Sequence, residues 1–127
     1  MASLIGRLDP WAPPLALMAL IFFLSAQQDL SSGLGALDLV GRKFVHAGIF
    51  GLLCVLLWRA FAPHLSPQRA LAAALLATVA YAVSDELHQT FVPTRSGSPV
   101  DVAIDTVGAA AVALAIRSRA RALRAGA

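Results

Sequence analysis

The stretch SDELHQTFVPTR, residues 84–95, gathers many of the side chains in this sequence that could do chemistry. It directly follows the apolar run ALAAALLATVAYAV. Asp85, His88 and Gln89 are spaced at i, i+3 and i+4, so they share one face of a helix. A charged side chain at the centre of a bilayer costs at least about 2.5–3.5 kcal/mol. The polar side chains of this stretch must therefore either have partners within the protein or be retained for a function.

Three kinds of chemistry are open to these side chains. A metal site is weakly indicated because no HExxH spacing is present, so we expect no metal and no cofactor. A nucleophile with its base is equally weakly indicated, since Ser84 lies one turn from His88 but nothing activates the serine. Arg42, Lys43 and Arg95 could hold a phosphate or a carboxylate. Anion binding fits the residue types best.

The composition is typical of a membrane protein, so the elements that position this cluster are expected to lie in a bilayer. Of the 127 residues, 58% are hydrophobic and only 13% charged, and the mean hydropathy is +0.74. Soluble domains carry about 25% charged residues. The chain is long enough for one domain, residues 1–127, and its basic residues form no aromatic-rich face for nucleic acid. The single cysteine, Cys54, lies in an apolar run and is expected to pack there.

Four apolar segments are long enough, or nearly so, to cross a bilayer, which takes about 20 residues. The fold expected is an all-α, polytopic membrane protein, an antiparallel bundle of four transmembrane helices. Pro13 and Pro14 open the first segment, and a Ser-Pro pair opens each of the last two. The first segment also resembles a cleavable signal peptide, an alternative that leaves the other spans unchanged. The predicted spans are about 11–26, 43–61, 67–92 and 99–116.

Basic residues predict the orientation, because cytoplasmic loops of membrane proteins are rich in Lys and Arg. With four spans, one side receives seven basic residues and the other receives three, Arg42, Lys43 and Arg95. Both termini are therefore expected in the cytoplasm, with the polar motif on the outer side of a plasma membrane. Most acids fall on that outer half: Asp29, Asp38, Asp85, Glu86, Asp101 and Asp105.

Helix geometry predicts that three of the spans bring polar groups to a similar depth. At about 1.5 Å of rise per residue, Asp85 lies roughly 10 Å and Asp105 roughly 9 Å below the outer helix ends. His46 lies a few residues inside the second span, and Lys43 shares its face. Ion pairs of Lys43 or Arg95 with the acids would make a polar pocket inside the outer half of the bundle.

Simpler explanations exist for each group. Asp101 stands in a first helical turn, where the helix dipole favours a carboxylate whether or not it has a function. Glu86 could face the lipid headgroups, and Asp38 could be a solvated loop residue. Asp85, His88 and Asp105 could hold the helices together without binding any ligand.

The same residues carry a resemblance. RKFVHAGIFGLL followed by SDELHQTFVPTRSGSPVDVAIDTVGA resembles the VanZ-like family of small membrane proteins, over roughly Phe22 to Ala113. The family shows a Lys with a His three residues later, an Asp-Glu block with His-Gln, an Arg-Ser, and two polar positions on the last helix. This chain departs at Asp105, where members often carry Asn. The matching site positions here are Lys43, His46, Asp85, Glu86, His88, Gln89, Arg95, Asp101 and Asp105.

The resemblance implies a role in the bacterial cell envelope, because the namesake of the family is associated with resistance to the glycopeptide teicoplanin. It does not imply a reaction. Two classes stay open: a protein whose outer pocket binds an anionic lipid or cell-wall precursor headgroup, and a small membrane hydrolase or transferase that acts on a lipid-linked substrate. The lack of a recognised nucleophile motif favours the first.

Overall fold

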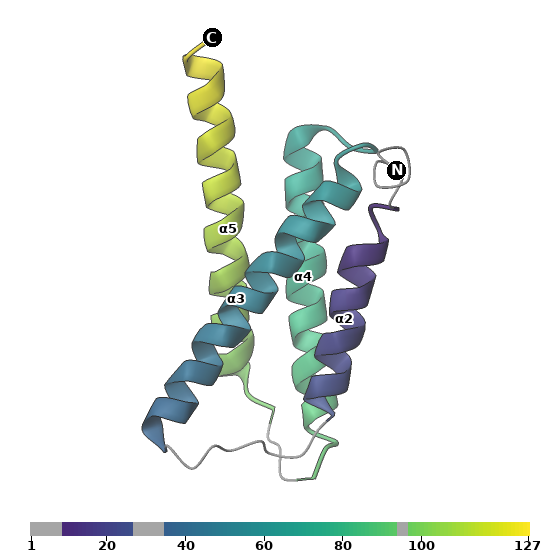
Figure 1. The fold of residues 1–127 in the computed structure, drawn as a ribbon, viewed down its shortest axis with the longest axis vertical. Coiled ribbons are helices and arrows are strands. Elements are labelled where there is room, and N and C mark those ends of the chain that lie inside the picture. Colours follow the sequence, from purple (N-terminus) through teal and green to yellow (C-terminus); the bar gives the residue numbers. More distant parts are fainter. Residues whose placement is uncertain (1–8, 27–34, 94–96) are drawn as a thin grey trace, which may run out of the picture.

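The computed structural model describes residues 9–26, 35–93 and 97–127, which form four helices that run alternately up and down (Figure 1). The predicted all-α antiparallel bundle is confirmed. The helices are α2 (Ala12–Ser25), α3 (Ala36–Phe61), α4 (Pro67–Gln89) and α5 (Pro99–Ala125).

Three helices start where the proline signals predicted. Pro13 and Pro14 occupy the first turn of α2, and Pro67 and Pro99 open α4 and α5. A proline costs nothing at these positions, because the first N–H groups of a helix have no partner within it. Ser98 also caps α5 with its side chain, since its hydroxyl accepts from the Val100 N–H at 3.2 Å.

The other helix boundaries differ from the predicted spans. The helix α3 begins at Ala36, seven residues before the predicted span, so Asp38 lies in its first turn and not in a loop. The helix α4 ends at Gln89, three residues early, and Pro93 follows after a turn. The helix α5 continues nine residues past the predicted end at Ile116 and projects beyond the other helices (Figure 1).

By length and composition, three of the described helices can cross a membrane: α3, α4 and α5. The fourth, α2, is apolar but only 14 residues long. The outer surfaces of the helices carry large apolar side chains, such as Phe23 and Leu76, 61% and 71% exposed. Such a surface suits contact with lipid, and the chain is a membrane protein.

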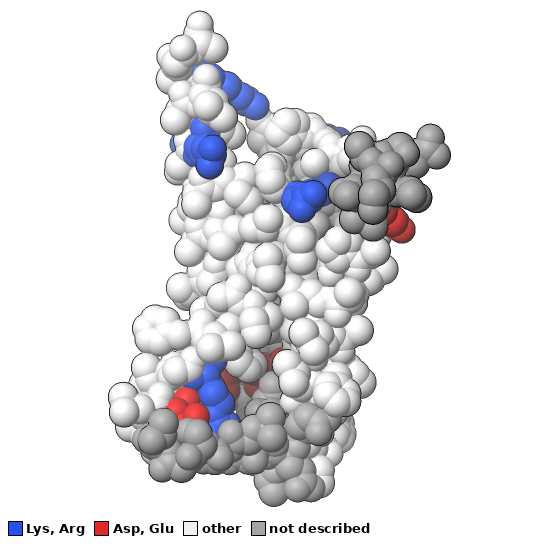
Figure 2. Space-filling view, in the orientation of Figure 1, with Lys and Arg blue, Asp and Glu red and all other residues white. Residues whose placement is uncertain are grey.

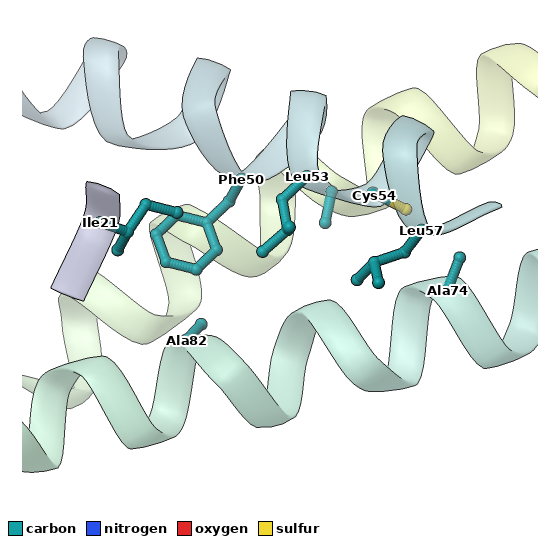
Figure 3. Close-up of a cluster of buried hydrophobic side chains, with 8 residues drawn as sticks. Ile21, Phe50, Leu53, Cys54, Leu57, Ala74 and Ala82 are labelled. Atoms are coloured by element: carbon teal, nitrogen blue, oxygen red, sulfur yellow. The ribbon is translucent and has the colours of Figure 1, made fainter. Parts of the chain in front are cut away.

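All four helices contribute to the core, in which Phe50, Leu53 and Leu57 of α3 meet small side chains of α4 (Figure 3). Ala74 and Ala82 are completely buried there. Small residues let helix backbones approach closely, which is how helices pack in a membrane. Cys54 is also fully buried in this cluster, which agrees with the packing role predicted for it.

The helices α3 and α5 cross at close range. A Cβ added to Gly108 would collide with the carbonyl oxygen of Ala47. A Cβ added to Gly51 would lie 2.9 Å from Cγ2 of Val112, also too close. The two backbones therefore cross at glycines on both helices.

The charged residues of the described helices gather at the two ends of the bundle. Figure 2 shows a broad uncharged band, with acidic atoms recessed in a hollow beside basic ones near the lower end. We call this the polar end; it contains the end of α2, the start of α3, the end of α4 and the start of α5. The opposite end contains the turn at residues 62–66 and the arginine-rich end of α5.

Candidate polar site

A small cavity of about 60 Å³ lies at the polar end between α2, α3 and α4. A water molecule occupies about 30 Å³ in the liquid, so the cavity has room for a small polar group. Polar side chains on all three helices line it, and apolar ones complete its wall. The lining residues are Ile21, Leu24, Ser25, His46, Ile49, Phe50, Asp85 and Gln89.

Asp85 and Gln89 form the polar wall that α4 contributes. Gln89 Nε2 donates to Asp85 Oδ2 at 3.2 Å, one helical turn away, and the two residues are 5% and 4% exposed. The other carboxylate oxygen, Asp85 Oδ1, is buried and has no hydrogen-bond partner among the described residues. A buried acceptor without a partner costs about 1–3 kcal/mol, so this oxygen is a candidate contact for a ligand.

His46 connects the cavity to Asp105 of α5. It lines the cavity, and its Nδ1 lies 3.6 Å from Asp105 Oδ1. This distance permits an ion pair but exceeds that of a hydrogen bond. The side chain of Asp105 is fully buried, and within the described parts of the chain neither of its carboxylate oxygens has a hydrogen-bond partner.

Lys43 and Asp101 form a separate ion pair on the α3–α5 side. Lys43 Nζ donates to Asp101 Oδ1 at 2.7 Å, and the side chains are 36% and 31% exposed. The expected ion pair between Lys43 and an acid of the outer half is present, so Asp101 has a charged partner in addition to its favourable place at the start of a helix. Neighbouring Arg42 pairs within α3, 2.8 Å from Asp38.

Glu86 does not face the headgroups, which corrects the simpler explanation for this residue. It is 5% exposed, and its Oε2 accepts from the backbone N–H of Ser98 at 2.9 Å. The chain approaches α4 closely at this point, because a Cβ added to Gly97 would collide with the Glu86 carbonyl oxygen. Glu86 thus ties the end of α4 to the start of α5.

His88 contacts α2 and not Ser84, the serine one turn away on its own helix. Its ring stacks on Phe22 with centroids 4.2 Å apart, and its Nδ1 lies 3.4 Å from Ser25 Oγ. Ser84 instead donates to the Tyr81 carbonyl at 2.8 Å. Ser25 and Phe50 are site residues that sequence reasoning missed, because both lie in apolar runs and only the packing of α2 and α3 brings them to α4.

The predicted site residues thus fall into distinct groups. Asp85, Gln89 and His46 line the cavity, and Asp105 lies behind His46. The pair of Lys43 and Asp101, the Glu86 contact and the His88 contact surround it. Arg95 lies outside the described residues. Within the described residues, no group of three or more His, Cys, Asp or Glu side chains is placed to hold a metal ion.

A comparison with known families agrees with this arrangement. The VanZ/LLP1 family model matches residues 11–120, which include all four helices up to the projecting end of α5. Comparisons with curated proteins and with solved structures gave no match. Because the family model covers most of the sequence, the chain belongs to the VanZ/LLP1 family of membrane proteins.

Proposed function

We propose that this protein binds the headgroup of an anionic lipid, or of a lipid-linked cell-wall precursor, at its polar end. The observation that carries the proposal is a cavity with polar walls inside an otherwise apolar bundle, with the partly exposed ammonium of Lys43 at the same end. Ionisable residues at membrane depth are functional candidates by default. A ligand anchored in the bilayer reaches such a site without leaving the membrane.

The proposal includes an orientation, with the polar end on the outer face of a bacterial plasma membrane and both termini in the cytoplasm. It is supported by the described basic residues, of which six lie toward the opposite end and two, Arg42 and Lys43, at the polar end. The six are Arg59, Arg69, Arg117, Arg119, Arg121 and Arg124. An outer headgroup site fits the cell-envelope role implied by the family, and teicoplanin resistance is the corresponding hypothesis.

Lys43 is the described residue best suited to the anionic part of the ligand. Its ammonium has three N–H donors, and the hydrogen bond to Asp101 uses one of them. With 36% of its side chain exposed, it can reach a phosphate or carboxylate at the membrane surface. Arg95, predicted from the sequence to share this role, belongs to the same proposal.

The test is binding of undecaprenyl phosphate to the purified protein in neutral detergent, measured by native mass spectrometry. Lys43→Gln should weaken binding by about tenfold, or about 1.4 kcal/mol. Arg59→Gln is the matched control, because Arg59 lies on the same helix near its opposite end. Equal binding by wild type and Lys43→Gln, or no binding by either, would contradict the proposal.

A second candidate, a membrane hydrolase or transferase, is favoured by one observation. Ser25 Oγ, at the cavity wall, lies 3.4 Å from His88 Nδ1, slightly beyond the usual distance between a nucleophile and its base but within the looser range of ligand-free enzymes. However, Ser25 ends α2, where the backbone presents carbonyl groups and no amides for an oxyanion. Labelling of Ser25 by a fluorophosphonate, lost in both Ser25→Ala and His88→Phe, would support catalysis.

A further inference from the structure

The cavity at the polar end has the chemistry of a site for a small cation. We infer that it receives the primary ammonium group of a headgroup that also carries a phosphate. This inference rests on the proposed function, because the same ligand would place its phosphate near Lys43. The chemical class is an amine-bearing phospholipid or an amine-bearing lipid-linked precursor.

Among the described residues that line the cavity, Asp85 is the acid, and His46 is the group that can carry a positive charge, which Asp105 at 3.6 Å offsets. Asp85 lines the cavity at 4% exposure with one oxygen lacking a hydrogen-bond partner in the described chain, and fully buried Asp105 lies behind His46. The nearby cations are engaged with other acids, Lys43 with Asp101 and Arg42 with Asp38. A carboxylate oxygen accepts hydrogen bonds and donates none, so its complement is a donor with positive charge.

An aromatic ring completes the cation-binding character of the cavity. Phe50 lines it and is 1% exposed, with its ring 6.3 Å from that of His46 and 6.4 Å from that of Tyr81. The face of an aromatic ring attracts a cation, and the attraction grows when water is excluded. Asp85 and Phe50 come from different helices, so the packing of α3 on α4 creates the combination.

The size and lining of the cavity select among amines. At about 60 Å³, with Ile21, Leu24 and Ile49 in its wall, it admits a group comparable to one or two water molecules. A primary ammonium has this size and presents three N–H donors to Asp85. A trimethylammonium group is larger and has no N–H donor, so it should be excluded.

The test compares three lipids with identical acyl chains in binding to the full-length protein: phosphatidylethanolamine, phosphatidylcholine and phosphatidylglycerol. Native mass spectrometry in neutral detergent should show phosphatidylethanolamine binding at least tenfold more tightly than phosphatidylcholine. Asp85→Asn should remove this preference while phosphatidylglycerol binding persists. Ser84→Ala is the matched control, because Ser84 neighbours Asp85 on α4 but donates to the Tyr81 carbonyl outside the cavity.

A second variant covers the case in which Asp85→Asn does not fold. Ser25→Val narrows the cavity without changing its charge and should also abolish the preference. Competition by an amine-bearing lipid-linked precursor, but not by its N-acetylated form, would identify the precursor as the stronger source of the amine. Competition by neither form would leave the aminophospholipid as the ligand.

The outcomes separate the inference from the proposed function. Equal binding of phosphatidylethanolamine and phosphatidylcholine by wild type would overturn the inference. If anionic lipids still bound in a Lys43-dependent way, the proposed function would stand alone. Absence of binding in every arm, with undecaprenyl phosphate included, would overturn both.

Discussion

At the scale of single residues, the acids of the polar end have different partners and therefore different expected roles. Glu86 accepts from a backbone N–H, Asp101 binds Lys43, and Asp85 binds Gln89 through one oxygen only. The Glu86 contact joins α4 to the start of α5, and the Asp101 contact joins α5 to α3. Asp85 lines the cavity and has one oxygen without a hydrogen-bond partner in the described chain, so it is the acid most suited to a ligand.

Glu86→Ala should lower the free energy of unfolding by about 1–3 kcal/mol, because it leaves the partly buried N–H group of Ser98 without its acceptor. Glu86→Gln should lose much less, since the amide oxygen can still accept. Thermal unfolding in detergent measures the difference. Equal melting temperatures for the Ala and Gln variants would show that the Ser98 contact does not stabilise the fold.

The pair of Lys43 and Asp101 should couple α3 to α5. In a double-mutant cycle of Lys43→Met and Asp101→Asn, we expect a coupling energy of about 0.5–1 kcal/mol, the upper range for partly exposed pairs. The measurement is the unfolding free energy of the four proteins in the cycle. Strictly additive effects would mean that the 2.7 Å contact contributes no net stability.

The sequence predicted these residues better than it predicted their partners. Spacing along one helix correctly placed Asp85 and Gln89 on a common face. It could not predict the Glu86 contact, whose partner is a backbone N–H beyond the turn after α4. Spacing also offered Ser84, one turn away on the same helix, as a weakly indicated partner of His88, whereas the structure places His88 against Ser25 of α2.

At the scale of helices, the crossing of α3 and α5 depends on glycine. Gly108 faces the Ala47 carbonyl with no room for a methyl group, and Gly51 faces Val112. His46, Asp105, Lys43 and Asp101 all lie toward the polar end from this crossing. The separation of the two backbones at the glycines therefore sets the distances in both ion pairs.

Gly108→Ala should destabilise the protein by about 1–3 kcal/mol, the usual cost of overpacking. Gly48→Ala on α3 is the matched control, because an added Cβ at Gly48 meets nothing within 4 Å. The control should be neutral or slightly stabilising, since alanine favours helix more than glycine does. The measurement is the melting temperature of each variant in detergent. Similar values for Gly108→Ala and Gly48→Ala would contradict the close approach of α3 and α5.

The helix starts that proline marks were predictable, whereas the start of α3 and the helix ends were less so. Proline marks a start because it fits the first turn and removes an N–H that has no helical partner there. The extra turns of α3 before Lys43 and of α5 after Ile116 contain charged residues, so hydropathy excluded them although the backbone stays helical. Apolar length predicts where a chain crosses lipid, and the helix can continue past that limit.

At the scale of the whole molecule, the bundle has one acidic, cavity-bearing end and one arginine-rich end, separated by an uncharged band (Figure 2). The asymmetry was predictable because basic residues could be counted along the sequence. The cavity was not, since it requires side chains of three helices to meet.

Single cysteines in a Cys54→Ala background should reveal the orientation. Thr90→Cys at the polar end and His64→Cys at the opposite end are both at exposed positions. A membrane-impermeant maleimide added to intact cells should label position 90 and leave position 64 unlabelled until the cells are permeabilised. Labelling of position 64 alone in intact cells would place the polar end in the cytoplasm.

The short helix α2 has a consequence for the surrounding lipid. Its 14 residues span about 21 Å, whereas the hydrocarbon core of a bilayer is about 30 Å thick. Hydrophobic mismatch of this size is relieved by local thinning of the bilayer, which lowers the headgroups beside the helix. Since the last turn of α2 lines the cavity, we expect short-chain lipids to favour occupancy of the proposed site.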